Sequence, residues 1–284
     1  MTNYESYLQI PEWRFIDESM SARNRSALES FAADDTLCHL VGQQMSAPTV
    51  RAWVHNKTVV LGIQDHRLPY VEDAVKHIEQ AGYQSIVRNS GGLAVVLDEG
   101  VLNLSLVISE REGSIDIDTG YEVMLSLIRL MFPEAEDRIE AYEIVGSYCP
   151  GSYDLSIDGK KFAGISQRRL RQGIAVQVYL CVEGSGSKRA ELIRDMYRIG
   201  LKQEQTKFEY PKIRPEVMAS LAELLNMPLT VSDVVIRAQQ VLHILTRNVK
   251  IESFLEEEME LYSFYLQRVF ERNEKMLARK TKQS

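Results

Sequence analysis

One short segment of the chain combines two residue types that can do covalent chemistry. Cys149 lies among turn-forming residues, beside Pro150 and Gly151, and Lys161 follows a few positions later. A thiol attacks a carbonyl as its thiolate, which needs a nearby cation at neutral pH because the unperturbed thiol has a pKa of about 8.5. We therefore consider Cys149 as a nucleophile and Lys161 as the cation that stabilises it.

The other two cysteines are in settings that favour a structural role. Cys181 falls in a strongly β-prone run, which predicts a small buried apolar side chain. Cys38 is next to His39 at the end of an expected helix, and neighbouring residues on a helix do not face each other. Cys149 differs from both because its proline and glycine neighbours place it in a loop, where functional groups concentrate.

The position of Lys161 depends on a predicted hairpin. Two β-prone runs, residues 153–157 and 161–165, are joined by Asp158 and Gly159, a strong signal for a tight turn between antiparallel strands. Lys161 opens the second strand, while Lys160 points to the opposite face of it. The spacing alone leaves both lysines as candidates.

Two glycine-rich segments could bring backbone N–H groups close to a ligand. Residues 88–92 join two expected strands, and their paired glycines could expose N–H groups to a carbonyl or a phosphate, although a simple tight turn is the commoner outcome. Residues 184–187 fit a flexible connection before a helix. Neither segment has the Gly-Lys-Ser/Thr of a phosphate-binding P-loop.

The periodicity of apolar residues predicts a mixed architecture. Helices are expected at residues 21–41, 70–81, 118–131, 190–199, 215–226, 231–247 and 254–278. Strands are expected at 49–55, 58–62, 84–88, 93–97, 102–108, 142–145, 153–157, 161–165 and 174–182, the first two as a hairpin. Without regular strand-helix alternation, an α/β fold of the α+β kind with a mixed β-sheet is favoured. We place a catalytic core at residues 1–190 and a helical C-terminal layer or subdomain, packed on the core, at residues 191–284.

Composition narrows the class of protein. The 284 residues are 45% apolar, and the net charge of −7 with a pI near 5.4 argues against nucleic-acid binding as the main function. The chain has no apolar run long enough for a membrane helix and no signal-like start, so we expect a cytoplasmic protein. Three widely spaced cysteines form neither a disulfide framework nor a zinc pattern, and we expect free thiols and no metal.

Several motifs together resemble a known superfamily. They are Thr58 to Gly62, Val87 to Gly92, Asp98 to Ser105, Tyr148 to Asp154 and Gly159 to Gly164, within a match of about residues 13–183. The chain resembles the lipoate-protein ligase, octanoyltransferase and biotin-protein ligase superfamily, and it is most similar to the lipoyl amidotransferase branch. That resemblance implies a mixed-sheet catalytic domain of the biotin/lipoate ligase type with flanking helices.

The resemblance also implies roles for individual residues. The superfamily's lysine, set in a Gly-x-Lys-x-x-Gly pattern, falls on Lys161, and the cysteine that carries an acyl group as a thioester falls on Cys149. The acyl group would bind along the glycine-rich segment and the end of the lysine motif, which contribute Arg88, Asn89, Ser90, Gly91, Gly92 and Gly164.

The implied reaction is an exchange of one lysine amide for another. An octanoyl group would move from a lysine of the glycine cleavage H protein to a lysine of lipoyl domains of 2-oxoacid dehydrogenase complexes, without a soluble cofactor. The thiolate of Cys149, stabilised by Lys161, would attack the octanoyl carbonyl while backbone N–H groups hold the oxyanion.

Three departures from the ligase pattern bear on the reaction. Ligases of the superfamily carry arginine, a small residue and histidine where this chain has Val87, Leu93 and Leu97. These apolar residues disfavour nucleotide binding and favour an acyl-tunnel wall. The alternatives that stay open are octanoyl transfer from acyl carrier protein, ATP-dependent lipoate ligation and, in a different class, a non-catalytic binder of lipoyl domains.

Overall fold

The computed structural model describes residues 4–88, 91–111, 113–246 and 248–278. The strands are β1 (Trp13–Glu18), β2 (Thr49–Trp53), β3 (Thr58–Leu61), β4 (Gln84–Val87), β5 (Val95–Leu97), β6 (Val101–Ser109), β7 (Ile139–Ala141), β8 (Asp154–Ile157), β9 (Lys160–Leu170), β10 (Gly173–Cys181) and β11 (Val249–Ile251). The helices are α1 (Ala27–Gly42), α2 (Val71–Gln80), α3 (Ile117–Met131), α4 (Gly186–Leu201), α5 (Leu221–Leu225), α6 (Val231–Leu245) and α7 (Met259–Ala278).

Two mixed sheets form the centre of the molecule. The large sheet has the order β11-β1-β2-β6-β10-β9-β8-β7, parallel from β11 to β2 and antiparallel from there on. The small sheet has the order β4-β3-β5, with β4 parallel and β5 antiparallel to β3. This mixed arrangement with flanking helices confirms the predicted fold class.

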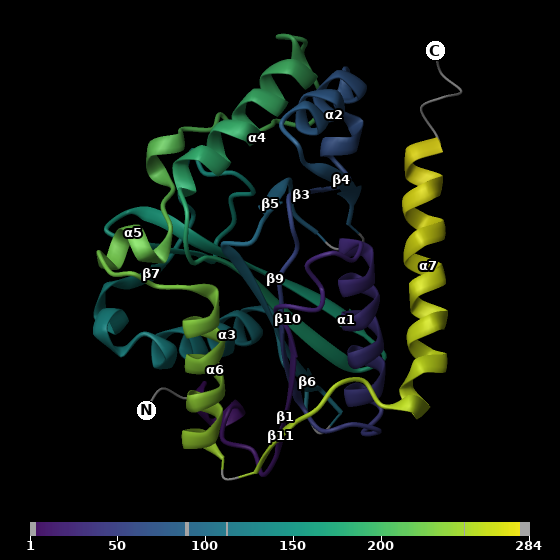
Figure 1. Cartoon of the computed structure of the whole chain (residues 1–284), viewed down its shortest axis with the longest axis vertical. Coiled ribbons are helices and arrows are strands. Elements are labelled where there is room, and N and C mark those ends of the chain that lie inside the picture. The colour runs from purple at the N-terminus through teal and green to yellow at the C-terminus, as the bar shows by residue number, and fades with distance from the viewer. Residues whose placement is uncertain (1–3, 89–90, 112, 247, 279–284) are drawn as a thin grey trace.

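Helices cover both faces of the large sheet (Figure 1). On one face α1 packs against β6, β9 and β10, with α7 outside it, and on the other face α3 packs against β9 and β10 and is covered by α6. The α1 helix begins later than predicted because Ser26 and Glu29 form a capping box there. It is buried on nearly all sides because it lies between the sheet and α7, so it can carry buried polar residues toward the sheet.

The predicted hairpin between residues 49–55 and 58–62 is wrong. The two strands exist, but β2 belongs to the large sheet, between β1 and β6, while β3 is the centre of the small sheet. Each is buried along its whole length because it has neighbours on both edges. The short connection at residues 54–57 therefore passes the chain from one sheet to the other.

The second predicted hairpin is confirmed. Strands β8 and β9 pair antiparallel across Asp158 and Gly159, which both have positive φ angles of 52° and 74°. Such angles are those of the tight turns that match the twist of paired strands. The hairpin fixes Lys161 opposite Ser156 and so determines the face from which the lysine side chain leaves the sheet.

The C-terminal part of the chain is mostly helical, as expected, but the helix predicted at residues 215–226 is replaced by a 3₁₀ turn at Pro215–Val217 and the short α5, and one strand is added. After α6 the chain forms the short strand β11, which pairs parallel with β1 and extends the large sheet at that edge. Residues 142–145, expected as a strand, are irregular instead, and β7 ends just before them. The division at residue 190 stays a prediction.

Candidate active site

Cys149 lies in the loop between β7 and β8, in a backbone conformation that non-glycine residues seldom adopt. Its φ angle is +45°, in the left-handed region, which costs roughly 1–2 kcal/mol for an L-residue. Strained residues of this kind persist only where their surroundings hold them and they concentrate at functional sites. Cys149 is half-buried, whereas Cys38 and Cys181 are fully buried.

The carboxylate of Asp154, at the start of β8, organises this loop. One oxygen accepts hydrogen bonds from the N–H of Ile144 at 3.1 Å and the hydroxyl of Ser147 at 3.3 Å, and the other accepts from the N–H of Gly151 at 3.1 Å. These donors precede and follow the cysteine, so one side chain ties both arms of the loop. Burial raises the pKa of Asp154, and the Lys161 ammonium opposes that rise.

Lys161 reaches the same loop from the hairpin. Its side chain is fully buried, and its ammonium forms an ion pair of 2.8 Å with Asp154 and donates hydrogen bonds of 2.9 Å to the carbonyls of Tyr148 and Cys149. A third bond, of 3.3 Å, goes to the hydroxyl of Ser147. Lys160 is exposed on the other face of the strand. The structure therefore places Lys161, and not Lys160, beside Cys149.

Among the described residues, two polar groups lie close to the sulfur of Cys149. The guanidinium of Arg88, 7% exposed, lies 3.3 Å from the sulfur, and the N–H of Leu93 lies 3.2 Å from it. Arg88 also donates a 2.6 Å hydrogen bond to the carbonyl of Leu93, which keeps the guanidinium in place. The hydrogen bonds of Lys161 go to the loop and not to the sulfur, so the cation at the sulfur is Arg88.

The glycine segment can come close to the cysteine because Gly92 has no side chain, and a side chain there would not fit. Gly92 has a φ angle of +100°, and a Cβ there would lie 2.1 Å from the Arg88 guanidinium and 3.0 Å from the Cys149 sulfur. Gly91 is exposed beside it. Asn89 and Ser90, which we predicted as substrate-binding residues, lie outside the described residues. The strand before the segment is braced by α7, where Asn273 accepts a 3.0 Å hydrogen bond from the N–H of Val87.

A cavity of about 280 Å³ extends from Cys149 across the large sheet. Its floor is a row of residues that are paired from strand to strand: Trp53 with Asn103, Asn103 with Tyr179, Tyr179 with Gly164, and Gly164 with Asp154. Adjacent strands lie about 4.8 Å apart, so this row gives an elongated site at right angles to the strands. A chain-like ligand attached to Cys149 would lie along it.

The wall opposite this floor is apolar. Val60, Val95 and Leu97 from the small sheet line the cavity together with Phe31 from α1. Leu97 is one of the three positions where the chain departs from the ligase pattern, and it contributes apolar surface to the cavity, as expected. Another of them, Val87, is buried in the core behind the site. Lys161 is not among the lining residues because it lies behind the cysteine loop.

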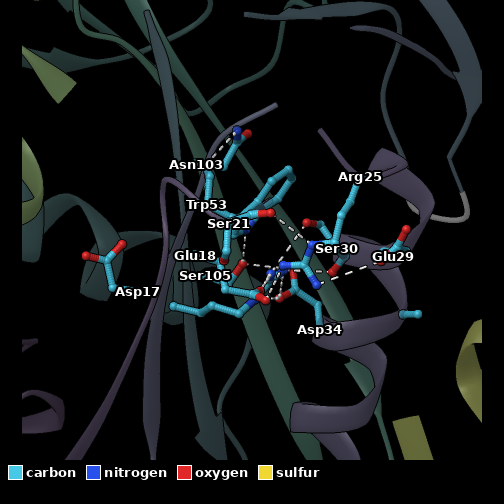
Figure 2. A network of polar contacts seen from close by, with 12 residues as sticks. Asp17, Glu18, Ser21, Arg25, Glu29, Ser30, Asp34, Trp53, Asn103 and Ser105 are labelled. Atoms are coloured by element: carbon cyan, nitrogen blue, oxygen red, sulfur yellow. Dashed lines mark hydrogen bonds and ion pairs between the residues drawn. The ribbon is translucent and has the colours of Figure 1, made fainter. Parts of the chain in front are cut away.

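A buried polar network closes the far end of the cavity. Asp34 on α1 accepts hydrogen bonds from Arg51 at 2.8 Å, from Ser105 at 2.8 Å and from Gln177. Figure 2 shows Asp34 and Ser105 pointing toward one another, with Trp53 and Asn103 nearby. Arg51 is fully buried and is also paired with Glu18 at 2.6 Å. Because Trp53 and Gln177 line the cavity, this network fixes the position of its end wall.

Sequence reasoning found most of this site and missed two members. Cys149, Lys161, Arg88, Gly91, Gly92 and Gly164 all lie around the cavity or the loop at its mouth. Asp154 and Tyr179 were not assigned a role. Asp154 is the last residue of the Tyr148 to Asp154 motif. Its position between a predicted loop and a predicted strand was the feature that could have indicated a role. Nothing in the sequence distinguished Tyr179 from other strand tyrosines.

Strained cysteine, buried cations and an elongated apolar cavity on a mixed sheet are features of an acyl-transferring enzyme. The lipoyl protein ligase A/B catalytic domain family matches residues 26–243, and the chain belongs to this family. It is 67% identical to the octanoyl-[GcvH]:protein N-octanoyltransferase of Lysinibacillus sphaericus over 97% of this chain and 99% of that one. It is 49% identical to the lipoyl-[GcvH]:protein N-lipoyltransferase of Listeria monocytogenes over 93% and 95%. The chain is thus an N-acyltransferase.

The fold also matches solved structures of the superfamily. A crystal structure of lipoate-protein ligase A bound with ATP superimposes with a TM-score of 0.67, at 15% identity, and covers 91% of this chain and 94% of that one. At this identity the likeness shows the shared fold. In the part of the chain that the structure describes, no helix is long and apolar enough to cross a membrane, and no cluster of potential metal ligands is found.

Proposed function

We propose that this enzyme transfers an octanoyl group from a lysine of the glycine cleavage H protein to a lysine of a lipoyl domain, through a thioester on Cys149. The observation that carries the proposal is the position of the Cys149 sulfur, which lies at the mouth of the elongated cavity between Arg88 and the N–H of Leu93. The relatives' names support an octanoyl donor on H protein.

The first half-reaction forms the thioester. The thiolate of Cys149, held by the Arg88 guanidinium and the Leu93 N–H, attacks the octanoyl carbonyl carbon, whose π electron pair moves to the oxygen. When this intermediate collapses, the C–N bond breaks and the departing lysine nitrogen takes a proton from the Lys161 ammonium, which for this step would have to leave its hydrogen bonds to the Tyr148 and Cys149 carbonyls and turn toward the cavity. H protein then leaves with a free lysine, and the octanoyl chain, now bound to Cys149, occupies the cavity.

The second half-reaction reverses the roles of the groups. The neutral amine of the acceptor lysine attacks the thioester carbonyl and gives a proton to Lys161, and the C–S bond breaks to restore the thiolate. One amide replaces another, so no ATP is needed. Asp154 stabilises the charged form of Lys161 and orients it toward the loop, which is a positioning role.

The proposed roles of the remaining residues follow the cavity. Gly91, Gly92 and Gly164 leave room for the chain, and Asn89 and Ser90, which lie outside the described residues, keep the substrate-binding role that the family resemblance implies. The catalytic unit would comprise residues 1–190, with residues 191–284 as a helical layer packed on it. We place the enzyme in the cytoplasm, where its three free cysteines stay reduced.

Mass spectrometry tests the covalent step. After incubation with octanoylated H protein, the enzyme should carry a hydroxylamine-labile gain of ~126 Da, the mass of one octanoyl group, on Cys149. Cys149→Ser should fold normally and lose both adduct and transfer. Cys38→Ala removes a thiol buried far from the cavity and should keep both.

The same experiment separates the alternatives. Transfer without any adduct would refute the thioester. An adduct from octanoyl acyl carrier protein but none from octanoylated H protein would assign the other donor, and dependence on ATP with free octanoate would make the enzyme a ligase. Binding of lipoyl domains without transfer would leave only the non-catalytic binder.

A further inference from the structure

The hydroxyl of Tyr179 is a buried polar group with no hydrogen-bond partner among the described residues. Tyr179 lies on β10, and its side chain is 8% exposed. An unpaired buried hydroxyl costs about 1–3 kcal/mol, and such groups are uncommon in folded proteins. The ring of Tyr148 stacks on that of Tyr179, with 5.9 Å between the ring centres. The Tyr148 hydroxyl has a partner, because it lies 3.7 Å from the sulfur of Cys181. The orphan hydroxyl of Tyr179 therefore requires an explanation.

The ring of Tyr179 is held beside the reacting groups. It lies across Gly164, where an added Cβ would be 2.7 Å from the ring carbon Cε1 and 3.4 Å from the hydroxyl oxygen. Gly164 pairs in turn with Asp154, and the Lys161 ammonium is 5.8 Å from the centre of the ring. Tyr179 lines the same cavity as Cys149. The glycine therefore makes room for a tyrosine at the catalytic end of the acyl site.

Three other polar side chains that line the cavity already have partners. Asn103 donates to the carbonyl of Trp53 at 3.3 Å, the side-chain amide of Gln177 donates to Asp34, and Ser166 donates to Gln177 at 3.4 Å. The Leu93 N–H and Arg88 face the sulfur. Tyr179 is thus a donor on this floor that is free to bind a ligand oxygen; the Nε of Arg88, which is also buried without a partner among the described residues, belongs to the guanidinium at the sulfur.

The hydroxyl also stays protonated at neutral pH. Burial raises the pKa of Tyr179 well above its ordinary value, and the negative charges that Tyr148, Cys181, Asp154 and Cys149 can carry act in the same direction. A hydroxyl that keeps its proton can donate a hydrogen bond but does not act as a base. Its hydrogen bond would be strongest to an oxygen that becomes negatively charged.

We propose that the Tyr179 hydroxyl donates a hydrogen bond to the acyl carbonyl oxygen while that oxygen carries the negative charge of the tetrahedral intermediate. This inference rests on the proposed thioester route. In each half-reaction the attacking group adds to the carbonyl carbon, the π pair becomes an oxyanion, and the oxyanion accepts the hydrogen bond without taking the proton. Collapse returns the pair to the C=O bond, and the hydrogen bond from the hydroxyl to the now neutral oxygen persists in a weaker form.

Single-turnover acylation of Tyr179→Phe by octanoylated H protein tests this role. Loss of one oxyanion donor should slow acylation by about 10²- to 10³-fold and leave the KM for the donor protein unchanged. Because the hydroxyl is unpaired in the free enzyme, the variant should unfold at the same or a higher urea concentration than the parent. Slower chemistry with undiminished stability is the combination that a purely structural hydroxyl would not produce.

A matched tyrosine provides the control. Tyr210 is buried to the same extent, and its hydroxyl donates a 2.7 Å hydrogen bond to the carbonyl of Gln64. Tyr210→Phe should keep the acylation rate and lose about 1 kcal/mol of stability, which is the opposite pattern. A Tyr179→Phe variant that behaves like Tyr210→Phe would overturn the inference.

Infrared spectroscopy of the acyl-enzyme gives an independent measurement. With ¹³C at the carbonyl and no acceptor present, the thioester stretch should lie at higher frequency in Tyr179→Phe than in the parent, because a hydrogen bond weakens the C=O bond. Equal frequencies together with equal rates would refute the role of Tyr179. A parent enzyme that forms no thioester at all would refute the proposed route instead, so the two failures are distinguishable.

Discussion

The two ends of the acyl cavity each contain a buried ion pair, and the pairs serve different purposes. At the closed end, Arg51 and Asp34 join β2 to α1 at 2.8 Å, and both side chains are almost fully buried. At the open end, Lys161 and Asp154 are equally close and equally buried, but their other bonds go to an irregular loop. The first pair fixes a wall between regular elements, and the second holds a strained cysteine in place.

The comparison shows how one site combines rigidity with reactivity. The closed end is saturated, because the Asp34 carboxylate accepts bonds from Arg51, Ser105 and Gln177. The open end leaves Cys149 half-buried and the Tyr179 hydroxyl without a partner among the residues that the structure describes. Changes at the closed end should therefore lower stability, and changes at the open end should lower activity.

The largest effect on stability is expected for Asp34→Ala at the closed end. Removing this carboxylate leaves Arg51 buried with only Glu18 as its charged partner, which should lower the free energy of unfolding by about 3–5 kcal/mol. Urea unfolding measures the loss. The pH dependence of Cys149 alkylation in the folded fraction should stay that of the parent; a shifted profile would mean that the two ends are coupled.

A smaller loss of stability is expected on acidification, and it too comes from the closed end of the cavity. Burial lowers the pKa of His55 from 6.5 to about 4, and the charge of Arg51 acts in the same direction. A depressed pKa contributes stability that is present above the unfolded value and lost as the pH falls through the folded one. The loss between pH 6.5 and 4 should approach 3 kcal/mol, about 1.4 kcal/mol per pH unit.

Urea unfolding at several pH values checks this expectation. In His55→Gln the amide can still bond the hydroxyl of Ser30, which lies 3.0 Å from the imidazole in the parent. The variant should show a shallower decline of stability below pH 6.5. An identical decline in both proteins would assign the acid sensitivity to other groups.

The smallest change in free energy is expected at the open end, from Arg88→Gln. Loss of the cation 3.3 Å from the sulfur should slow alkylation of Cys149 near neutral pH, because the reactive thiolate loses the opposite charge beside it. Iodoacetamide alkylation across pH measures it. Arg194→Gln, at an exposed position, is the matched control. An unchanged alkylation profile would mean that Lys161, and not Arg88, is the cation that stabilises the thiolate.

Local patterns predicted the elements on which the site is built. The Asp158-Gly159 turn was read correctly because a two-residue turn with positive φ angles is specified by its own residues. The same reasoning failed for β2 and β3, since a short connection looks alike whether it joins two strands of one sheet or passes between sheets. Strand β11 was missed because it is short and depends on β1 for its pairing.

The candidate site was predictable where its members are close in the chain. Cys149 and Lys161 stand on a loop and a hairpin that are consecutive in the sequence, and the lysine does reach the carbonyl of the cysteine. Arg88 was expected to bind the acyl group, but its contact with the sulfur was not foreseen. That contact spans 61 residues and exists because the small sheet faces the large one across the cavity.

The sequence by itself determined the class of fold, the cysteine in its loop and the choice of family, because turn chemistry, apolar periodicity and short motifs are local properties. Only the tertiary structure decided which cation lies at the sulfur, which groups line the cavity and that the Tyr179 hydroxyl has no partner among the described residues. These depend on how strands from distant parts of the chain come into register, and the row from Trp53 to Asp154 exists only once five strands are paired.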